Sequence, residues 1–374
     1  MRFETLSVHA GATPDPGTSA IAAPIHLSTT FEHGPAYEAL HGYRYIRNEN
    51  PTQTRLEQAL AALDEGEAAF AWASGMAAGA AYLQTLPAGS HVVFPDDMYY
   101  GYRAIARDFF PRWGLTATEV DTASLGAVRA ALRPATRLIW AESPSNPMMK
   151  VADLAALAEL AHGAGAQLLV DGTFATPALQ QPLALGADAV LHSTTKYLGG
   201  HSDVQGGALV LKRRDERAQA LLDVREHLGA VASPFNSWLI LRGLRTLACR
   251  LERHSANALA LATAMAAHRG VAAVCYPGLP GSPGHAIAAR QMRAFGGMLS
   301  LRIKGGRAAA LAVASRVKLF LNATSLGGTE SLLEHRASSE GPASATPDDL
   351  LRLSVGLEHP QDLIDDLVQA LDGR

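Results

Sequence analysis

The sequence predicts an α/β fold: a doubly wound, mostly parallel sheet in a large domain, followed by a smaller α+β domain. Three observations support this prediction. Short apolar runs alternate with helical segments, the runs are apolar on both faces as buried parallel strands are, and the hydrophobic pattern changes after about residue 248. With 374 residues, of which 48% are hydrophobic, the chain is long enough for two domains with sizeable cores.

The first 45 residues contain Pro14, Pro16, Pro24 and Pro35 and predict an irregular arm. A helix is expected over residues 52–63, because Pro51 is a good entry signal. Another helix is expected over 151–164. Strands are expected over 91–94, 137–140, 167–170, 189–191 and 207–210.

The C-terminal part has a different pattern. We expect a helix over 250–268, strands over 297–303 and 351–357, and a last helix beginning at Pro360. In residues 351–357, leucine and valine alternate with Arg352, Ser354 and Gly356, which predicts one packed face and a second face that carries Arg352. The chain is thus predicted to divide into an arm (1–48), a large domain (49–247) and a small domain (248–374).

Composition excludes several function classes. The net charge of −3 provides no basic field for nucleic acid or an anionic membrane. The two cysteines, Cys249 and Cys275, cannot form a disulfide framework and are predicted to be buried thiols. Residues 1–16 lack the apolar core of a secretory signal, so we expect a cytoplasmic protein. The histidines share no metal-ligand spacing, and no metal site is predicted.

Polar residues gather directly after the predicted strands. Because the carboxyl ends of parallel strands lie along one edge of the sheet, these residues are expected to meet there, where such sheets bind ligands. They are Asp96, Asp97 and Tyr99 after the first strand, Glu142, Ser143, Ser145 and Asn146 after the second, Asp171 after the third, and Ser193, Thr194, Thr195 and Lys196 after the fourth.

The side chains of this edge suggest a cofactor. A lysine such as Lys196 is by itself most often a solvated charge, and a carboxylate such as Asp171 is most often a helix cap. Together they suit a ligand with both an aldehyde and a basic ring nitrogen. The hydroxyls of Ser193 and Thr195, with a helix start at residues 74–76, suit a phosphate. Pyridoxal 5′-phosphate carries all three groups.

At this point the chain resembles the pyridoxal-phosphate family of cysteine and methionine metabolism. That resemblance implies the aspartate aminotransferase-like fold (fold type I) and an active site shared between two chains of a homotetramer built as a dimer of dimers. The segments that carry it span nearly the whole chain: 45–52, 74–76, 142–147, 170–177, 193–200, 325–328 and 352–358.

The resemblance also implies roles. Lys196 would bind the cofactor covalently and move protons, Asp171 would pair with the ring nitrogen, and Tyr99 would stack on the ring and act as acid or base. Phosphate ligands would be Ser74, Gly75, Met76, Ser193 and Thr195, with Tyr45 and Arg47 of the partner subunit. Asn146 would contact the cofactor or the substrate, and Arg352 with Ser325 would bind the substrate α-carboxylate.

Some positions depart from the family pattern. Arg44 stands where γ-lyases and γ-synthases commonly have an acidic residue, Ala104 where related enzymes often have an arginine, and Gly172 where an asparagine is usual. Glu330 is retained, as in those enzymes. Arg44 could pair with Glu330 across the pocket, meet a distal carboxylate of the substrate, or simply be solvated.

The function expected from the resemblance is transsulfuration chemistry of the cystathionine γ-lyase or γ-synthase type: elimination or replacement at the γ (or β) carbon of sulfur-containing or O-acylated homoserine-type amino acids. Methionine γ-lyase and cystathionine β-lyase are the alternatives. An O-acylhomoserine sulfhydrylase or an aminotransferase is less favoured. A non-enzymatic regulator that keeps the cofactor fold is disfavoured by the presence of Lys196, Asp171 and Arg352.

Overall fold

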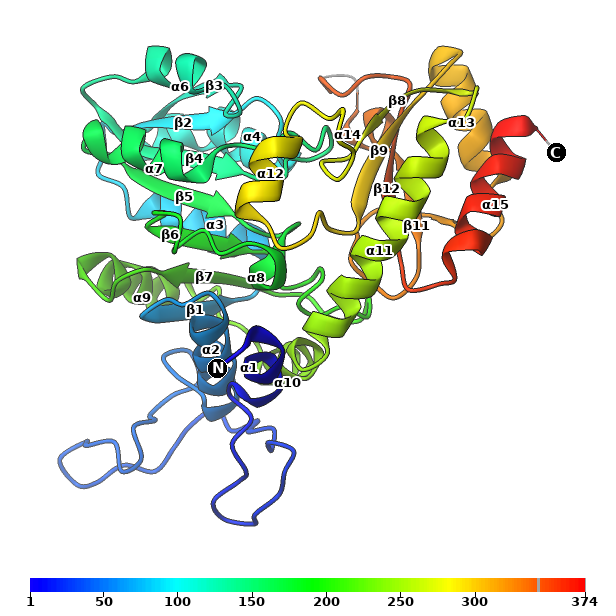
Figure 1. Ribbon diagram of the computed structural model, residues 1–374. Helices are drawn as coiled ribbons and strands as arrows, with labels where there is room; N and C mark the ends of the chain where they lie inside the picture. The colour runs from blue at the N-terminus through cyan, green and yellow to red at the C-terminus, as the bar shows by residue number, and fades with distance from the viewer. Residues whose placement is uncertain (342–343, 374) are drawn as a thin grey trace.

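The computed structural model describes residues 1–341 and 344–373. It contains a seven-stranded sheet and a five-stranded sheet, with the long helix α11 (Leu247–Ala266) running from the first toward the second (Figure 1). The predicted combination of a mostly parallel sheet with a smaller α+β part is confirmed. The predicted domain boundaries stay predictions.

In the large sheet, every strand except one runs in the same direction. Its order is β1 (Ala68–Trp72), β7 (Gly207–Leu211), β6 (Ala189–His192), β5 (Gln167–Asp171), β4 (Thr136–Glu142), β2 (His91–Pro95) and β3 (Thr116–Val120). All five strands predicted here are present, and β1 and β3 were missed. β3 is mostly exposed or half-buried and therefore lacks an apolar run.

The direction of β7 was predicted wrongly. It pairs antiparallel with both β1 and β6. Residues 193–206 form turns rather than a helix, so the chain returns to the sheet without the crossover that a parallel neighbour needs. A fully apolar run indicates that the strand is buried on both faces of the sheet, but it does not indicate whether the strand runs parallel or antiparallel to its neighbours.

Helices cover the sheet and connect its strands. Helix α2 begins as predicted, with Pro51 in its first turn and the Asn50 side chain accepting a hydrogen bond from the Thr52 amide at 2.9 Å. The first ten helices are α1 (Phe3–His9), α2 (Pro51–Leu63), α3 (Gly75–Gln84), α4 (Tyr100–Asp108), α5 (Phe110–Trp113), α6 (Leu125–Ala131), α7 (Leu154–Gly163), α8 (Thr176–Leu179), α9 (Glu216–Leu228) and α10 (Pro234–Leu244). The arm is therefore not wholly irregular, because α1 lies within it and packs on α2 and α11.

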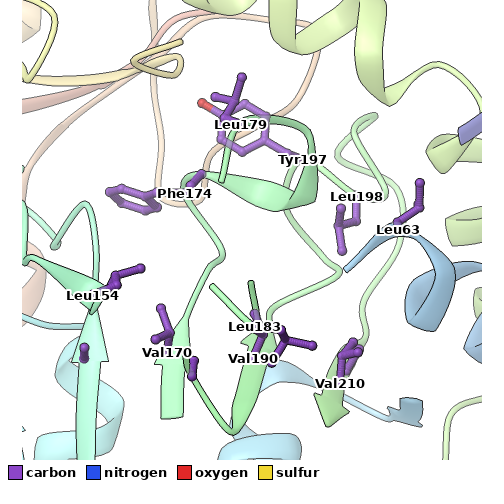
Figure 2. Packing of buried hydrophobic residues seen from close by; sticks show 14 of the residues in the cluster. Leu63, Leu154, Val170, Phe174, Leu179, Leu183, Val190, Tyr197, Leu198 and Val210 are labelled. Atoms are coloured by element: carbon purple, nitrogen blue, oxygen red, sulfur yellow. The ribbon is translucent and has the colours of Figure 1, made fainter. Parts of the chain in front are cut away.

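Apolar side chains from the strands and the covering helices interlock beneath the strand ends (Figure 2). Val170, Val190 and Val210 lie on three neighbouring strands. Their side chains belong to the same buried cluster as Leu63 of α2 and Leu154 of α7. All five side chains are at most 1% exposed. Such a close-packed layer fixes the strand ends, and with them the polar residues that follow.

The second sheet has the order β10 (Leu321–Asn322), β11 (Leu332–His335), β12 (Leu350–Ser354), β9 (Met298–Ile303) and β8 (Val271–Cys275). Its helices are α12 (His285–Gln291), α13 (Gly306–Arg316), α14 (Arg336–Glu340) and α15 (Pro360–Asp372). All five residues of β12 are buried, so the second face, which carries Arg352 as predicted, is covered as well. On this face the Arg352 guanidinium donates a hydrogen bond to Asn146, which follows β4 of the large sheet.

Two further observations concern the whole chain. Cys249 is exposed and Cys275 is partly exposed, so the prediction of buried thiols is wrong for Cys249. It lies on α11 between the buried positions of that helix, where the helical period turns it outward. Within the described ranges, no helix is long and apolar enough to cross a membrane.

Candidate active site

A cavity of about 310 Å³ lies where the carboxyl ends of the parallel strands meet the smaller sheet. The structure brings eleven of the predicted site residues to its wall: Ser74, Gly75, Met76, Tyr99, Asn146, Asp171, Ser193, Thr195, Lys196, Ser325 and Arg352. They come from seven separate stretches of sequence. The polar residues that follow the strands thus lie together, as the parallel arrangement requires.

Lys196 lies in the turn after β6, and its amine donates a hydrogen bond to the Ser325 hydroxyl at 2.7 Å. Burial, with a smaller contribution from the nearby Arg352 guanidinium, lowers the pKa of Lys196 to about 8. A substantial share of this amine is therefore neutral near pH 8, as addition to an aldehyde requires.

The glycines of residues 325–328 bring the Ser325 loop onto the lysine segment. A Cβ on Gly327, whose φ is +77°, would lie 2.6 Å from the Tyr197 amide nitrogen, so only glycine permits this approach. Ser325 itself has a φ of +83°. Non-glycine residues held in that region cost roughly 1–3 kcal/mol and gather at functional sites.

Asp171 is the last residue of β5 and is 6% exposed. Burial raises the pKa of its carboxyl group, and the hydrogen bonds from Thr173 oppose that shift. Behind it lies the fully buried pair of His192 and Asp64, whose Nε2 and Oδ2 atoms are 2.9 Å apart. A buried carboxylate at a cavity wall suits a cationic ring nitrogen as its partner.

The N-terminus of α3 faces the same cavity. Ser74 caps this ten-residue helix by accepting from the Ala77 amide at 3.1 Å. A Cβ on Gly75 would lie 2.9 Å from the Ser193 Cβ, so a side chain here would fill the space between the helix end and the Ser193 hydroxyl. A positive helix end beside hydroxyl groups suits a phosphate.

Glu142, which was expected after a strand but was not among the predicted site residues, holds the backbone of Tyr99 in place. The Tyr99 amide donates to the Glu142 carboxylate at 2.9 Å. Burial, reinforced by the charge of Asp171, raises the pKa of Glu142 well above its usual value. Burial also raises the pKa of the Tyr99 hydroxyl. The ring of Tyr100 packs on that of Tyr99, with 4.9 Å between the ring centroids.

Arg352 crosses from β12 into the cavity. One terminal nitrogen donates to Asn146 at 3.1 Å, and the other donates to the Ser325 carbonyl at 3.0 Å and to Glu334 at 2.5 Å. Burial lowers the pKa of Arg352 to about 10. Glu334 and Arg336 also line the cavity and were missed. The available sequence signal was a glutamate and an arginine two residues apart, directly after the short apolar run Leu332-Leu333.

Four predicted residues lie away from this cavity within one chain. Tyr45 is 44% exposed, with the Arg47 guanidinium 5.3 Å from its ring centroid. Arg44 lies over the Tyr37 ring instead, at 5.7 Å. Glu330 bonds to the Ser202 and Thr329 hydroxyls. The suggested pair of Arg44 and Glu330 is not formed within the chain.

The residues present fit pyridoxal 5′-phosphate. Lys196 matches the aldehyde, Asp171 matches the ring nitrogen, and the α3 N-terminus with Ser193 and Thr195 matches the phosphate. Among the described residues, no group of three or more histidine, cysteine, aspartate or glutamate side chains could hold a metal ion.

Comparisons with known proteins agree with this geometry. The family model for the Cys/Met metabolism PLP-dependent enzymes matches residues 4–372. The chain is 51% identical to a cystathionine γ-synthase of Mycobacterium tuberculosis over 373 residues, which covers 98% of this chain and 96% of that protein. It is 42% identical to a cystathionine γ-lyase of Bacillus subtilis, with 100% of both chains covered.

The crystal structure of metB from Corynebacterium glutamicum superposes with a TM-score of 0.96 at 44% sequence identity, covering 100% of this chain and 98% of the other. This likeness confirms the expected fold type. The cofactor is pyridoxal 5′-phosphate. The chain belongs to the pyridoxal-phosphate-dependent enzymes of cysteine and methionine metabolism.

Proposed function

We propose that the chain catalyses replacement at the γ-carbon of an O-acylated homoserine-type amino acid by a thiol, the reaction type of a cystathionine γ-synthase. The observation that carries the proposal is the cavity in which Lys196, Asp171 and Arg352 meet. The 51% identity to a γ-synthase over nearly the whole chain favours this member of the family.

Each step assigns work to residues of this chain. The bound cofactor supplies an electron sink for the substrate α-carbon. Arg352 binds the substrate carboxylate through its planar fork and fixes the α-carbon near Lys196. The Lys196 amine takes the α-proton and gives it up, and it can then take a proton from the β-carbon. The bond between the γ-carbon and the acyloxy oxygen breaks, and the acyl group leaves as a carboxylate. The thiol loses its proton to solvent and its sulfur bonds to the γ-carbon, after which the β- and α-carbons each regain one proton.

Asp171 keeps the cofactor's ring nitrogen protonated, which is what lets the ring accept electrons from the substrate. Tyr99 lies at the wall with its amide held by Glu142 and covers one side of the cavity. Ser325 accepts a hydrogen bond from Lys196 and thereby aims the lysine amine. The charge, reach and burial of these residues support the roles that the resemblance implies.

Elimination by a cystathionine γ-lyase-type reaction is the second candidate, favoured by the 42% identity to a γ-lyase over the full length of both chains. A substrate panel separates the two. Cysteine with O-succinyl- or O-acetylhomoserine should give cystathionine and the free acid. Cystathionine, methionine, homocysteine and cysteine alone should release ammonia and a 2-oxo acid more slowly. A 2-oxo acid formed without ammonia or thiol would instead indicate an aminotransferase.

The proposal includes a second copy of the chain. Tyr45 and Arg47 are accessible and lie apart from the cavity of their own chain. We assign them to the phosphate of a neighbouring subunit, in a homotetramer of two catalytic dimers. The cytoplasmic location stays a prediction.

A further inference from the structure

Arg352, Glu334 and Arg336 line the cavity, and with Glu340 behind them they form a row of four alternating charges. Arg352 donates to Glu334 at 2.5 Å, Arg336 donates to both oxygens of Glu334 at 3.2 and 3.3 Å, and Arg336 donates to Glu340 at 2.7 Å. The four side chains are at most 8% exposed. The row contains two positive and two negative charges, so it is neutral without a ligand.

Glu334 accepts a hydrogen bond from the part of the Arg352 guanidinium that we expect to bind the substrate carboxylate. The two terminal nitrogens of Arg352 already donate to Asn146, the Ser325 carbonyl and Glu334. These bonds use three of the five guanidinium N–H groups, including both on the second terminal nitrogen, so a substrate carboxylate that binds through this nitrogen would have to displace one of its acceptors. Of the three acceptors of Arg352, Glu334 is the only charged one, so Glu334 is the strongest competitor.

Arg336 offers Glu334 another partner. It already contacts both carboxylate oxygens, and its Nε is buried with no hydrogen-bond partner among the described residues. A buried unpaired N–H group is costly, and its presence calls for a reason. Here the Nε–H group is an unused donor on Arg336. Arg336 is the residue that would remain paired with Glu334 if Arg352 no longer bonded to Glu334.

We infer that Glu334 is a positioning residue that holds Arg352 in the free enzyme and passes to Arg336 when the substrate carboxylate binds. This inference rests on the proposed role of Arg352 as the carboxylate fork. The exchange leaves every buried charge with a partner before and after binding. A single unpaired buried charge would be strongly unfavourable.

The inference predicts opposite effects for two substitutions. In Glu334→Gln, the charged competitor is gone and Arg352 should bind a carboxylate more tightly. In Arg336→Met, Glu334 has only Arg352 left and should block it. L-norvaline is a suitable probe, because its side chain has no leaving group. Its binding to the cofactor-loaded enzyme is followed by the change in visible absorbance. We expect Glu334→Gln to lower its Kd about tenfold and Arg336→Met to raise it about tenfold.

Two controls isolate the carboxylate. Removing the carboxylate from norvaline gives n-butylamine. Because n-butylamine has no carboxylate for Arg352 to bind, its Kd should change by no more than about twofold in either variant. Arg307→Met removes an arginine of helix α13 that is paired at the surface with Asp348, and it should leave norvaline binding unchanged.

A readout without cofactor checks the same point. Cofactor-free Glu334→Gln should have a lower thermal midpoint than the parent, because the Arg352 guanidinium has lost its counter-charge. Butyrate should restore more of that midpoint in Glu334→Gln than it adds to the parent.

Weaker norvaline binding in both variants would mean that the row is only structural and would overturn the inference. Unchanged binding in both, or equal effects on norvaline and n-butylamine, would also overturn it. If Glu334→Gln does not fold, Arg336→Met decides alone by the norvaline-to-butylamine comparison. If opposite effects appear while no member of the substrate panel is turned over, the proposed reaction is wrong and this inference stands.

Discussion

The strand-end edge of the large sheet and the N-terminal arm carry residues predicted for the same site, yet they differ in their surroundings. Asp171 is 6% exposed and lies on the cavity with Lys196, whereas Tyr45 is 44% exposed and lies apart from it. Lys196 and Asp171, whose pKa values are shifted, thus lie where the packed core of the sheet fixes their positions. Tyr45, which we assign to the site of a second chain, lies on an accessible loop.

The largest expected effect is at the edge. Lys196→Ala removes both the covalent attachment point and the proton carrier, so turnover should fall by about 10⁴-fold, the upper range for a positioned acid–base group. The visible absorbance of the bound cofactor should change with it. Lys212→Ala, at the far end of β7, is the matched control and should keep both. Full turnover in Lys196→Ala would remove the basis of the proposed mechanism.

The second effect is also at the edge and concerns charge alone. Asp171→Asn keeps the shape of the side chain but cannot carry the negative charge that pairs with the ring nitrogen. We expect turnover to fall about 10²- to 10³-fold, the range seen when one preorganised electrostatic partner is lost. Steady-state kinetics on the best substrate of the panel measures this. Equal rates for parent and variant would mean that the ring nitrogen has another partner.

The arm should give a smaller effect of a different kind. Arg47→Ala should weaken cofactor retention about tenfold, because one charge-assisted hydrogen bond to the phosphate is lost. Dialysis followed by cofactor titration measures it.

Mixing tests whether the arm serves a second chain. Neither Arg47→Ala nor Lys196→Ala alone should have normal activity at limiting cofactor. After subunit exchange, a hybrid contains one site with an intact lysine and the intact arm of the other chain. Activity should rise above the sum of the separate variants. A mixture that never exceeds that sum would show that the arm serves its own chain.

The smallest effect is a pH dependence at the edge. Since burial lowers the pKa of Lys196 to about 8, the amine gains its neutral, reactive form as pH rises through that value. The rate at which the cofactor-free protein captures pyridoxal phosphate should therefore rise between about pH 7 and 9 and then level off. Stopped-flow absorbance measures this. A rate that kept rising toward pH 10.5 would indicate an ordinary solvated lysine.

The same contrast explains what the sequence could predict. Apolar runs followed by Asp171 or Lys196 report both a strand and what lies at its end, because a parallel sheet brings strand ends to one edge. The direction of β7 was not predictable in this way, since burial on both faces is compatible with either direction. β3 was missed because an edge strand with exposed positions has no continuous apolar run.

Side-chain pairing was beyond the sequence pattern as well. Arg336 follows Glu334 by two residues, but the contact between Glu334 and Arg352 depends on the antiparallel register that sets these two residues opposite each other in β11 and β12. That register arises from long-range pairing. The alternation in residues 351–357 placed Arg352 on the second face of its strand, but it did not indicate that this face is buried, since its partner Asn146 follows a strand of the other sheet.

The covalent attachment of the cofactor tests the account most directly. The chain has five lysines, at positions 150, 196, 212, 304 and 318. Borohydride reduction of the loaded protein, followed by peptide mass spectrometry, would locate the pyridoxyl adduct. The account predicts the adduct on Lys196. An adduct on any of the other four, or none on the loaded protein, would contradict it.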